Sequence, residues 1–201
     1  MTPEDRARRI HVLIFDVDGV LTDGQLYFLP EDGGKPDTNG KRHGLEFKGF
    51  TAHDGLGITL ARLGGLRVGI ITKRESATVA IRAQDLRLEF VYQGQAHKLA
   101  AAEEIVAKAG CTLAELAYVG DDVVDLPVMR ACGLSIATAN ARPQAKAAAH
   151  YVTPNPGGHG AGRDAIDFIL AAQGKLDTAI ATFLDAENPA AAAADISTGQ
   201  M

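Results

Sequence analysis

The chain has 201 residues, of which 46% are hydrophobic and 22% charged, so we expect one domain with a substantial core. Its formal net charge of −5 argues against a surface for nucleic acid or an anionic membrane. No apolar run approaches the ~20 residues of a membrane-spanning helix. Segment 1–9 lacks the apolar stretch of a secretory signal, so we expect a cytoplasmic protein.

The first predicted element is a buried parallel strand at 11–15, because this run is short, β-branched and apolar. Segments 25–29 and 45–50 predict a hairpin whose strands are joined by the polar turn 30–44. Two strands alone are marginal in water, and these carry several large apolar side chains. We therefore expect a second subunit to cover the hairpin.

The remainder of the chain alternates predicted strands and helices. Strands are expected at 66–71, 88–92, 116–119, 134–137 and 150–153. Helices are expected at 56–63, 76–83, 126–131 and 176–186, and Asp54 is expected to cap the first of them. Three more helices are expected, one that ends near residue 109, one that begins near Pro143 and one that ends near residue 172. This order predicts a doubly wound parallel α/β sheet in one domain, 10–187, with the hairpin insertion 24–50 and a flexible tail, 188–201.

Two aspartates stand at the end of the first predicted strand. Asp16 follows the apolar run directly, and Asp18 and Gly19 come next. Carboxylates in such a place are costly unless a cation lies near them. Gly19 allows the backbone to turn away tightly. An Asp-Gly turn is common in itself, but it does not account for Asp16.

Polar groups also follow the later strands. Thr72 follows the strand 66–71, Lys98 comes after the strand 88–92, and Asp121 follows the strand 116–119. Each has an ordinary explanation as a turn residue, a solvated lysine or a helix cap. Ligands of doubly wound sheets bind outside the carboxyl ends of the strands, so we expect these groups at one site.

The aspartates suit phosphoryl transfer. Asp16 and Asp121 offer the hard oxygen ligands that Mg²⁺ prefers. Asp16 can attack phosphorus and form an aspartyl-phosphate. Asp18 can protonate the leaving alkoxide and then activate water.

The other groups support this chemistry. Thr72 can bind a phosphoryl oxygen, and Lys98 can neutralise charge on the transferring group. Asp122 and Asp125 are expected to hold metal-bound water or to orient Lys98.

In this order, Asp16-Val17-Asp18-Gly19, Thr72, Lys98 and Gly120-Asp121-Asp122-x-x-Asp125 resemble the four motifs of the haloacid dehalogenase superfamily of phosphatases. Residues 12–177 are also similar to its capless 3-deoxy-D-manno-octulosonate 8-phosphate (KDO 8-phosphate) phosphatases. The matching stretches are VLIFDVDGVLTDG, HDGLGI, YQGQ-x-x-KL, AYVGDDVVDLPVM, YVT with GG-x-GA, and AAQGKLD.

The resemblance implies Mg²⁺-dependent hydrolysis of KDO 8-phosphate in lipopolysaccharide precursor synthesis, with Asp16, Asp18 and Asp121 as metal ligands. It implies a homotetramer in which a neighbour's hairpin covers the active site. The segment between Asp23 and Thr72 has room for a hairpin and one helix, so a cap domain is not expected.

Three positions depart from the family pattern. His53 and His159 stand where arginine is usual, and Lys73 replaces a glycine. Histidine cannot form the paired hydrogen bonds that an arginine makes to a carboxylate. These departures therefore leave open which sugar acid is recognised. Arg74 and Arg163 match the family, and the candidates for substrate binding are Arg74, Lys73, His53 and Arg163.

Three other functions compete with this interpretation. A phosphatase for a nonulosonate 9-phosphate of the sialic-acid type would have the same motifs. A receiver domain also uses Asp, Thr or Ser, and Lys, but its acidic pair and its phospho-acceptor follow the first and third strands. A silent oligomerisation domain would have lost Asp16 or Lys98, and both are present.

Overall fold

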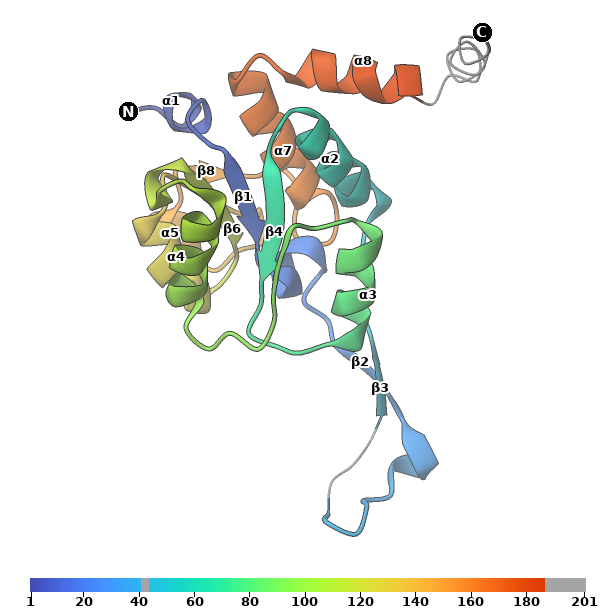
Figure 1. The fold of residues 1–201 in the computed structure, drawn as a ribbon. Helices are drawn as coiled ribbons and strands as arrows, with labels where there is room; N and C mark the ends of the chain where they lie inside the picture. Colours follow the sequence, from blue (N-terminus) through green and yellow to red (C-terminus); the bar gives the residue numbers. More distant parts are fainter. Residues whose placement is uncertain (41–43, 187–201) are drawn as a thin grey trace, which may run out of the picture.

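A six-stranded parallel sheet forms the centre of the molecule in the computed structural model, which describes residues 1–40 and 44–186 (Figure 1). The strand order is β5-β4-β1-β6-β7-β8, and every neighbouring pair is parallel. The strands are β1 Val12–Phe15, β4 Arg67–Ile71, β5 Phe90–Tyr92, β6 Leu116–Gly120, β7 Leu134–Ala137 and β8 Tyr151–Val152. The predicted doubly wound α/β fold is confirmed, and the predicted tail 188–201 lies outside the described residues.

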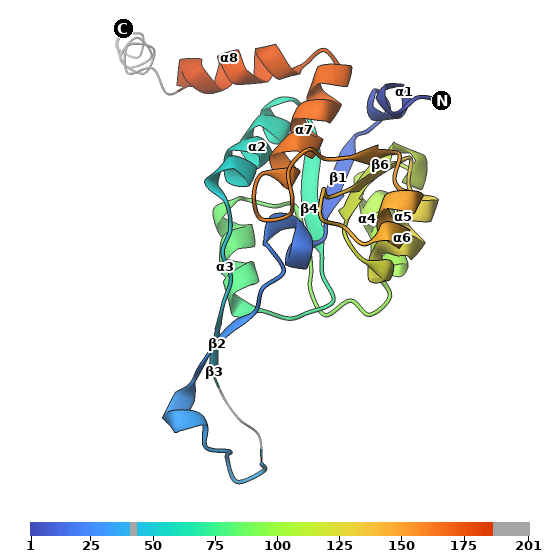
Figure 2. The same cartoon turned by 180° about the vertical axis from the view of Figure 1, so that it is seen from behind.

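Helices cover both faces of the sheet (Figures 1 and 2). The helices packed on one face are α4 Lys98–Ala109, α5 Leu126–Ala131 and α6 Pro143–Ala148. Those packed on the other are α1 Pro3–Ala7, α2 Ala52–Leu63, α3 Ala77–Asp85, α7 Ala161–Ala172 and α8 Leu176–Ala186. Among the described residues, none of these helices has the length and apolar character needed to cross a membrane.

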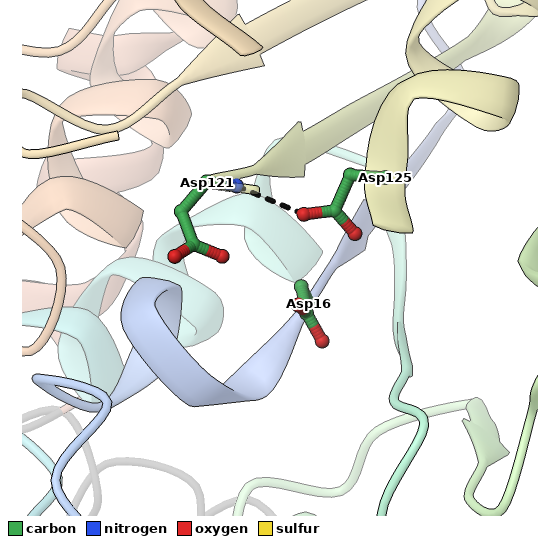
Figure 3. Close-up of side chains that lie close together, drawn as sticks. All are labelled: Asp16, Asp121 and Asp125. Carbon is green, nitrogen blue, oxygen red and sulfur yellow. Dashed lines mark hydrogen bonds between the residues drawn. The ribbon is translucent and has the colours of Figure 1, made fainter. Parts of the chain in front are cut away.

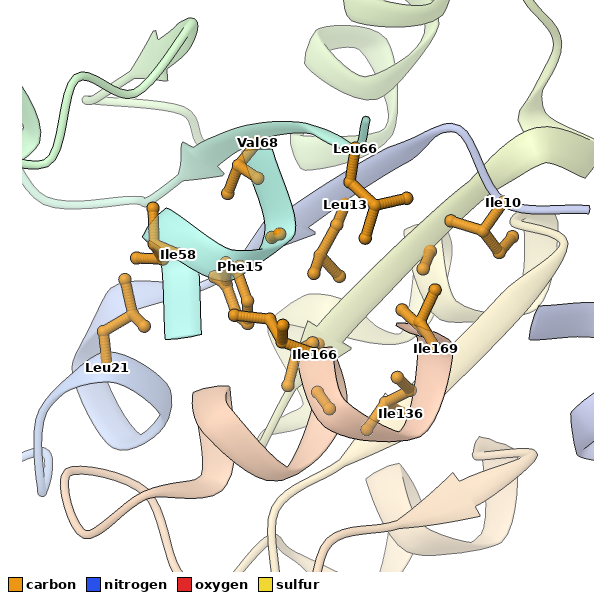
Figure 4. Packing of buried hydrophobic residues seen from close by; sticks show 14 of the residues in the cluster. Ile10, Leu13, Phe15, Leu21, Ile58, Leu66, Val68, Ile136, Ile166 and Ile169 are labelled. Atoms are coloured by element: carbon orange, nitrogen blue, oxygen red, sulfur yellow. The ribbon is translucent and has the colours of Figure 1, made fainter. Parts of the chain in front are cut away.

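Strand β1 lies at the centre of two cores. Leu13 and Phe15 point to the cluster that includes Ile58 of α2 and Ile166 of α7 (Figure 4). Val12 and Ile14 belong to the cluster on the opposite face. Successive side chains of a strand point to opposite faces, so a strand buried on both faces must be apolar throughout. This explains why no polar residue interrupts β1 before its end.

Two features near the helix termini differ from the prediction. Helix α1 was not expected; it is five residues long and begins with a capping box between Thr2 and Asp5. Helix α2 begins at Ala52, and its cap is Thr51 and not Asp54. Asp54 lies inside α2, where it is buried and accepts a 2.8 Å hydrogen bond from the backbone N–H of Arg163. It therefore caps α7 from a neighbouring helix.

The hairpin stands apart from the central sheet. Strands β2 Tyr27–Pro30 and β3 Gly44–Phe47 pair antiparallel and project from the body of the molecule (Figures 1 and 2). Part of the predicted turn 30–44, residues 41–43, lies outside the described residues, and a 3₁₀ turn, Glu31–Gly34, follows β2. The exposed apolar side chains of the hairpin are Leu26, Tyr27, Phe28, Leu29, Leu45 and Phe47.

Candidate active site

The carboxyl ends of three neighbouring strands form the floor of the site. The register pairs Phe15, the last residue of β1, with Ile70 of β4 and Val119 of β6. Asp16 and Thr72 therefore follow adjacent strands, with Thr72 one residue further along than Asp16, and both are buried. The backbone N–H of Asp16 still donates to Val119, which fixes the start of the turn.

Three carboxylates converge at this edge of the sheet. Oxygen atoms of Asp16, Asp121 and Asp125 all lie within 4.8 Å of one another (Figure 3). Asp16 comes from the end of β1, whereas Asp121 and Asp125 come from the segment after β6. Asp16 is only 5% exposed, and Oδ1 of Asp121 is buried without a hydrogen-bond partner among the described residues. The distant sequence motifs thus form one acidic cluster.

Gly19 makes the close approach of two segments possible. It lies in the turn Val17–Leu21 with φ of +88°, a conformation that favours glycine. A Cβ atom at this position would lie 2.2 Å from Oδ2 of Asp121. A side chain at residue 19 would therefore displace Asp121 from the cluster.

Asp125 is the hydrogen-bonding centre of the site. Its side chain is fully buried, and Oδ1 accepts from Lys98 Nζ at 2.7 Å and from the Tyr118 hydroxyl at 2.8 Å. Oδ2 accepts from the backbone N–H groups of Asp121 at 2.9 Å and Asp122 at 3.2 Å. A carboxylate with this many donors is held in one orientation. Asp125 thereby fixes both the lysine and the loop that carries Asp121.

Lys98, the first residue of α4, lies between two acids. Its Nζ is 2.8 Å from Asp16 and 2.7 Å from Asp125, and its side chain is 1% exposed. Burial lowers the pKa of the ammonium, but both carboxylates outweigh that effect and raise it above its ordinary value. The lysine therefore stays charged beside Asp16.

Tyr118 also belongs to the site, and sequence reasoning missed it. Burial and the nearby Asp125 raise the pKa of its hydroxyl well above the ordinary value, so the hydroxyl remains a donor to Asp125. The only signal in the sequence was one polar atom inside an otherwise apolar strand.

The carboxylates repel one another despite Lys98. Burial first, and then Asp125, raise the pKa of Asp16 to about 7. Burial first, and then Asp16, raise the pKa of Asp121 to about 7. A divalent cation would offset this repulsion, and it would supply the partner that Oδ1 of Asp121 lacks. The hard oxygen donors and their spacing fit Mg²⁺.

Asp18 is not one of the three carboxylates of this cluster, and it pairs instead with a lysine of the hairpin and with Arg74. Oδ1 of Asp18 contacts the Lys48 ammonium, and Oδ2 lies 3.8 Å from Nε of Arg74. Glu46 lies 3.6 Å from Lys48 and accepts a 2.7 Å hydrogen bond from Arg74. Sequence reasoning missed Glu46 and Lys48, although their alternation with apolar residues is typical of one face of a strand.

The predicted substrate-binding residues lie around the acidic cluster at different places. Arg74 is half-buried beside Glu46, whereas Lys73 and His53 are exposed. Arg163 forms a 2.7 Å ion pair with Asp167 in α7. Among the described residues, none of these four has a hydrogen bond or ion pair with Asp16 or Asp121. Arg74 is the only one of the four that is tied to Asp18.

A protein-family model and curated relatives place the chain in the same group of phosphatases. Residues 70–162 match the model of the haloacid dehalogenase-like hydrolases. The chain is 42% identical over 174 residues to the 3-deoxy-D-manno-octulosonate 8-phosphate phosphatase KdsC of Escherichia coli K12, covering 87% of this chain and 86% of that protein. The chain belongs to the KDO 8-phosphate phosphatase family.

Solved structures of KDO 8-phosphate phosphatases have the same fold. The enzyme of Yersinia pestis is 41% identical, covers 87% of this chain and 88% of its own, and superposes with a TM-score of 0.76. The enzyme of Moraxella catarrhalis, solved with magnesium, phosphate and KDO, is 37% identical and has a TM-score of 0.80. The match covers 90% of this chain and 97% of that enzyme. The family resemblance seen in the motifs is confirmed.

Proposed function

We propose that this protein hydrolyses KDO 8-phosphate to KDO and phosphate with Mg²⁺ in the cytoplasm. The observation that carries the proposal is the convergence of Asp16, Asp121 and Lys98 at one buried point. The relatives that match over most of the chain include KDO 8-phosphate phosphatases, one of them solved with magnesium, phosphate and KDO. Asp16 and Asp121 would hold the metal, whereas the Asp18 carboxylate, which the motif implies as a further ligand, is paired with Lys48 and Arg74 instead.

The first step transfers the phosphoryl group to the protein. The Asp16 carboxylate attacks phosphorus, the bond between phosphorus and the sugar oxygen breaks, and Asp18, which enters this step in its protonated form, gives that oxygen its proton. Lys98 favours the ionised form of Asp16 and neutralises charge on the phosphoryl oxygens. Thr72 binds one of these oxygens, and bound Mg²⁺ supplies further neutralisation of the phosphate.

The second step releases phosphate. Asp18, now ionised, takes a proton from a water molecule that attacks the phosphorus of the aspartyl-phosphate. The bond to Asp16 breaks, inorganic phosphate leaves, and Asp16 returns to its carboxylate form. Asp125 orients the loop of Asp121 and fixes Lys98, and Asp122 caps the short helix that follows.

Arg74 is the proposed cation that binds the substrate carboxylate. Lys73, His53 and Arg163 are the further candidates for contacts with the sugar. A nonulosonate 9-phosphate is the second candidate substrate, because His53, Lys73 and His159 depart from the family pattern around the sugar site. The departures leave the phosphoryl-transfer residues unchanged.

A substrate panel with and without metal tests the function. Purified protein with Mg²⁺ is expected to release phosphate from KDO 8-phosphate faster than from a nonulosonate 9-phosphate. EDTA is expected to abolish release, and added Mg²⁺ to restore it. Faster hydrolysis of the nonulosonate would reassign the substrate. Labelling by acetyl phosphate with no turnover of any sugar phosphate would instead support a receiver.

We further propose a homotetramer built by the hairpins. In this proposal residues 10–187 form one domain, with the insertion 24–50 in place of a cap domain. The support is the run of apolar side chains on both hairpin strands, among them Phe28 at 56% and Leu29 at 57% exposure. A second copy of the chain carries an apolar surface of the same kind, so mutual burial would remove it from water.

Light scattering is expected to give four times the chain mass of 21.1 kDa. The double variant Leu29→Ser, Leu45→Ser changes two cross-strand partners and is expected to shift the protein to smaller species. Leu184→Ser, an equally exposed leucine on α8, is the matched control and is expected to stay tetrameric. A wild-type protein that is monomeric at micromolar concentration would contradict the proposal.

A further inference from the structure

We infer that Lys48, from the base of the hairpin, is a positioning residue that fixes the Asp18 carboxylate for proton transfer. The inference rests on the proposed function, because it concerns the acid and base of that reaction. Its basis is a charged cluster formed by Asp18, Lys48, Glu46 and Arg74, which we term the stem cluster.

Lys48 is unusual because its whole side chain is inside the protein. The side chain is 0% exposed, and its ammonium contacts Oδ1 of Asp18 with Glu46 at 3.6 Å. Taking an ammonium group out of water is costly, and its acidic partners offset that cost only if the geometry holds. Buried ion pairs contribute little net stability, so this arrangement is better explained by what Lys48 does to Asp18.

Asp18 is held from two sides. Lys48 contacts one carboxylate oxygen, and Arg74 lies 3.8 Å from the other. Glu46 links the two cations, because it accepts a 2.7 Å hydrogen bond from Arg74 and pairs with Lys48. The four charges alternate in sign around a ring. Loss of Lys48 would leave Asp18 with the more distant cation alone.

The hairpin strand presents these groups by simple alternation. Leu45 and Phe47 are exposed, whereas Glu46 and Lys48 on the other face are largely buried against the domain. The Thr78 hydroxyl of α3 donates a 2.9 Å hydrogen bond to the backbone carbonyl of Glu46. This contact fixes the strand relative to the domain, and thereby fixes the position from which Lys48 reaches Asp18.

The chemical consequence depends on the leaving group. An alkoxide leaves only with a proton from Asp18, and a misplacement of ~1 Å can cost about a hundredfold in rate. Nitrophenolate leaves without protonation, so transfer from 4-nitrophenyl phosphate to Asp16 does not need a well-placed Asp18. The ratio of kcat/KM for the two substrates therefore reports the position of Asp18, since kcat/KM includes only steps up to the first irreversible one.

The test compares Lys48→Met with Lys35→Met in the full-length protein with Mg²⁺. Lys35 is exposed near the tip of the same hairpin, so it is the matched control. Lys48→Met is expected to lower kcat/KM for KDO 8-phosphate about a hundredfold, and that for 4-nitrophenyl phosphate less than fivefold. Lys35→Met is expected to change neither. Lys48→Arg keeps a cation beside Asp18 and is expected to recover at least a tenth of the lost activity.

Equal losses on both substrates would overturn the inference, because they would indicate a general structural role. No loss on the sugar phosphate would also overturn it. If Lys48→Met does not fold, Glu46→Gln, which weakens the same cluster, is expected to give a selective loss of about tenfold. If the wild type hydrolyses another sugar phosphate but not KDO 8-phosphate, the proposed function fails while the ratio still tests Lys48. If it hydrolyses no alkyl phosphate, both fail.

Discussion

Asp16→Asn is expected to lower the rate of phosphate release by at least ~10⁴-fold and to leave the protein folded. The amide has the shape of the carboxylate but cannot attack phosphorus. It also removes one charge from a cluster in which burial and Asp125 raise the pKa of Asp16 to about 7. Lys98 keeps its 2.7 Å contact with Asp125 in this variant, so the ammonium is not left alone.

Phosphate release and thermal unfolding, measured on the same preparation, check this expectation. Asp23→Asn is the control, because Asp23 follows the same turn and its carboxylate accepts from the backbone and side chain of Gln25. It is expected to stay within a few-fold of wild-type activity. Full activity in Asp16→Asn would remove Asp16 as the nucleophile, and loss of folding would leave the mechanism to be tested by trapping the phosphoenzyme.

Asp125→Ala is expected to lower both stability and activity. The change removes one of the two carboxylates beside Lys98, and it leaves the Tyr118 hydroxyl and two backbone N–H groups without their acceptor. Breaking a buried charged pair in this way costs about 3–5 kcal/mol in the free energy of unfolding. The Asp121 loop and Lys98 both lose their support, so activity should fall by at least ~10²-fold.

Asp122→Ala provides the comparison, since it removes a neighbouring acid from the same loop. The Asp122 carboxylate is half-buried and accepts from the backbone N–H of Val123 as a helix cap. Loss of such a cap costs about 1 kcal/mol, and the activity loss should be correspondingly smaller. Urea unfolding of both variants gives the change in the free energy of unfolding, and steady-state kinetics gives the change in activity. Similar effects in the two variants would contradict the central role of Asp125.

The strand ends could be predicted because the physical requirement is local. A run such as residues 11–15 can stay apolar throughout only if both faces are buried, and a parallel sheet then brings its end beside the ends of its neighbours. Asp16, Lys98 and Asp121 were therefore expected together, and they lie together. The glycine at residue 19 was expected to allow a tight turn, and it does so with a positive φ.

The contacts of individual side chains could not be predicted from the sequence, because they depend on tertiary packing. Both Asp122 and Asp125 were candidates to orient Lys98, but it is Asp125 that accepts from the Lys98 ammonium and the Tyr118 hydroxyl, whereas Asp122 accepts from the backbone of Val123. Lys48 could not be assigned to Asp18 because the approach of the hairpin to the domain depends on tertiary contacts such as that of Thr78. Asp54 was expected to cap its own helix, whereas packing of α2 on α7 gives it the N-terminus of a different one.

The hairpin has a consequence for protein engineering. A minimal phosphatase made by excising the insertion would lose Glu46 and Lys48 together with the exposed leucines and aromatics. Redesign of the outward face alone, at positions such as Leu29 and Leu45, would leave the contacts of Glu46 and Lys48 with the domain in place.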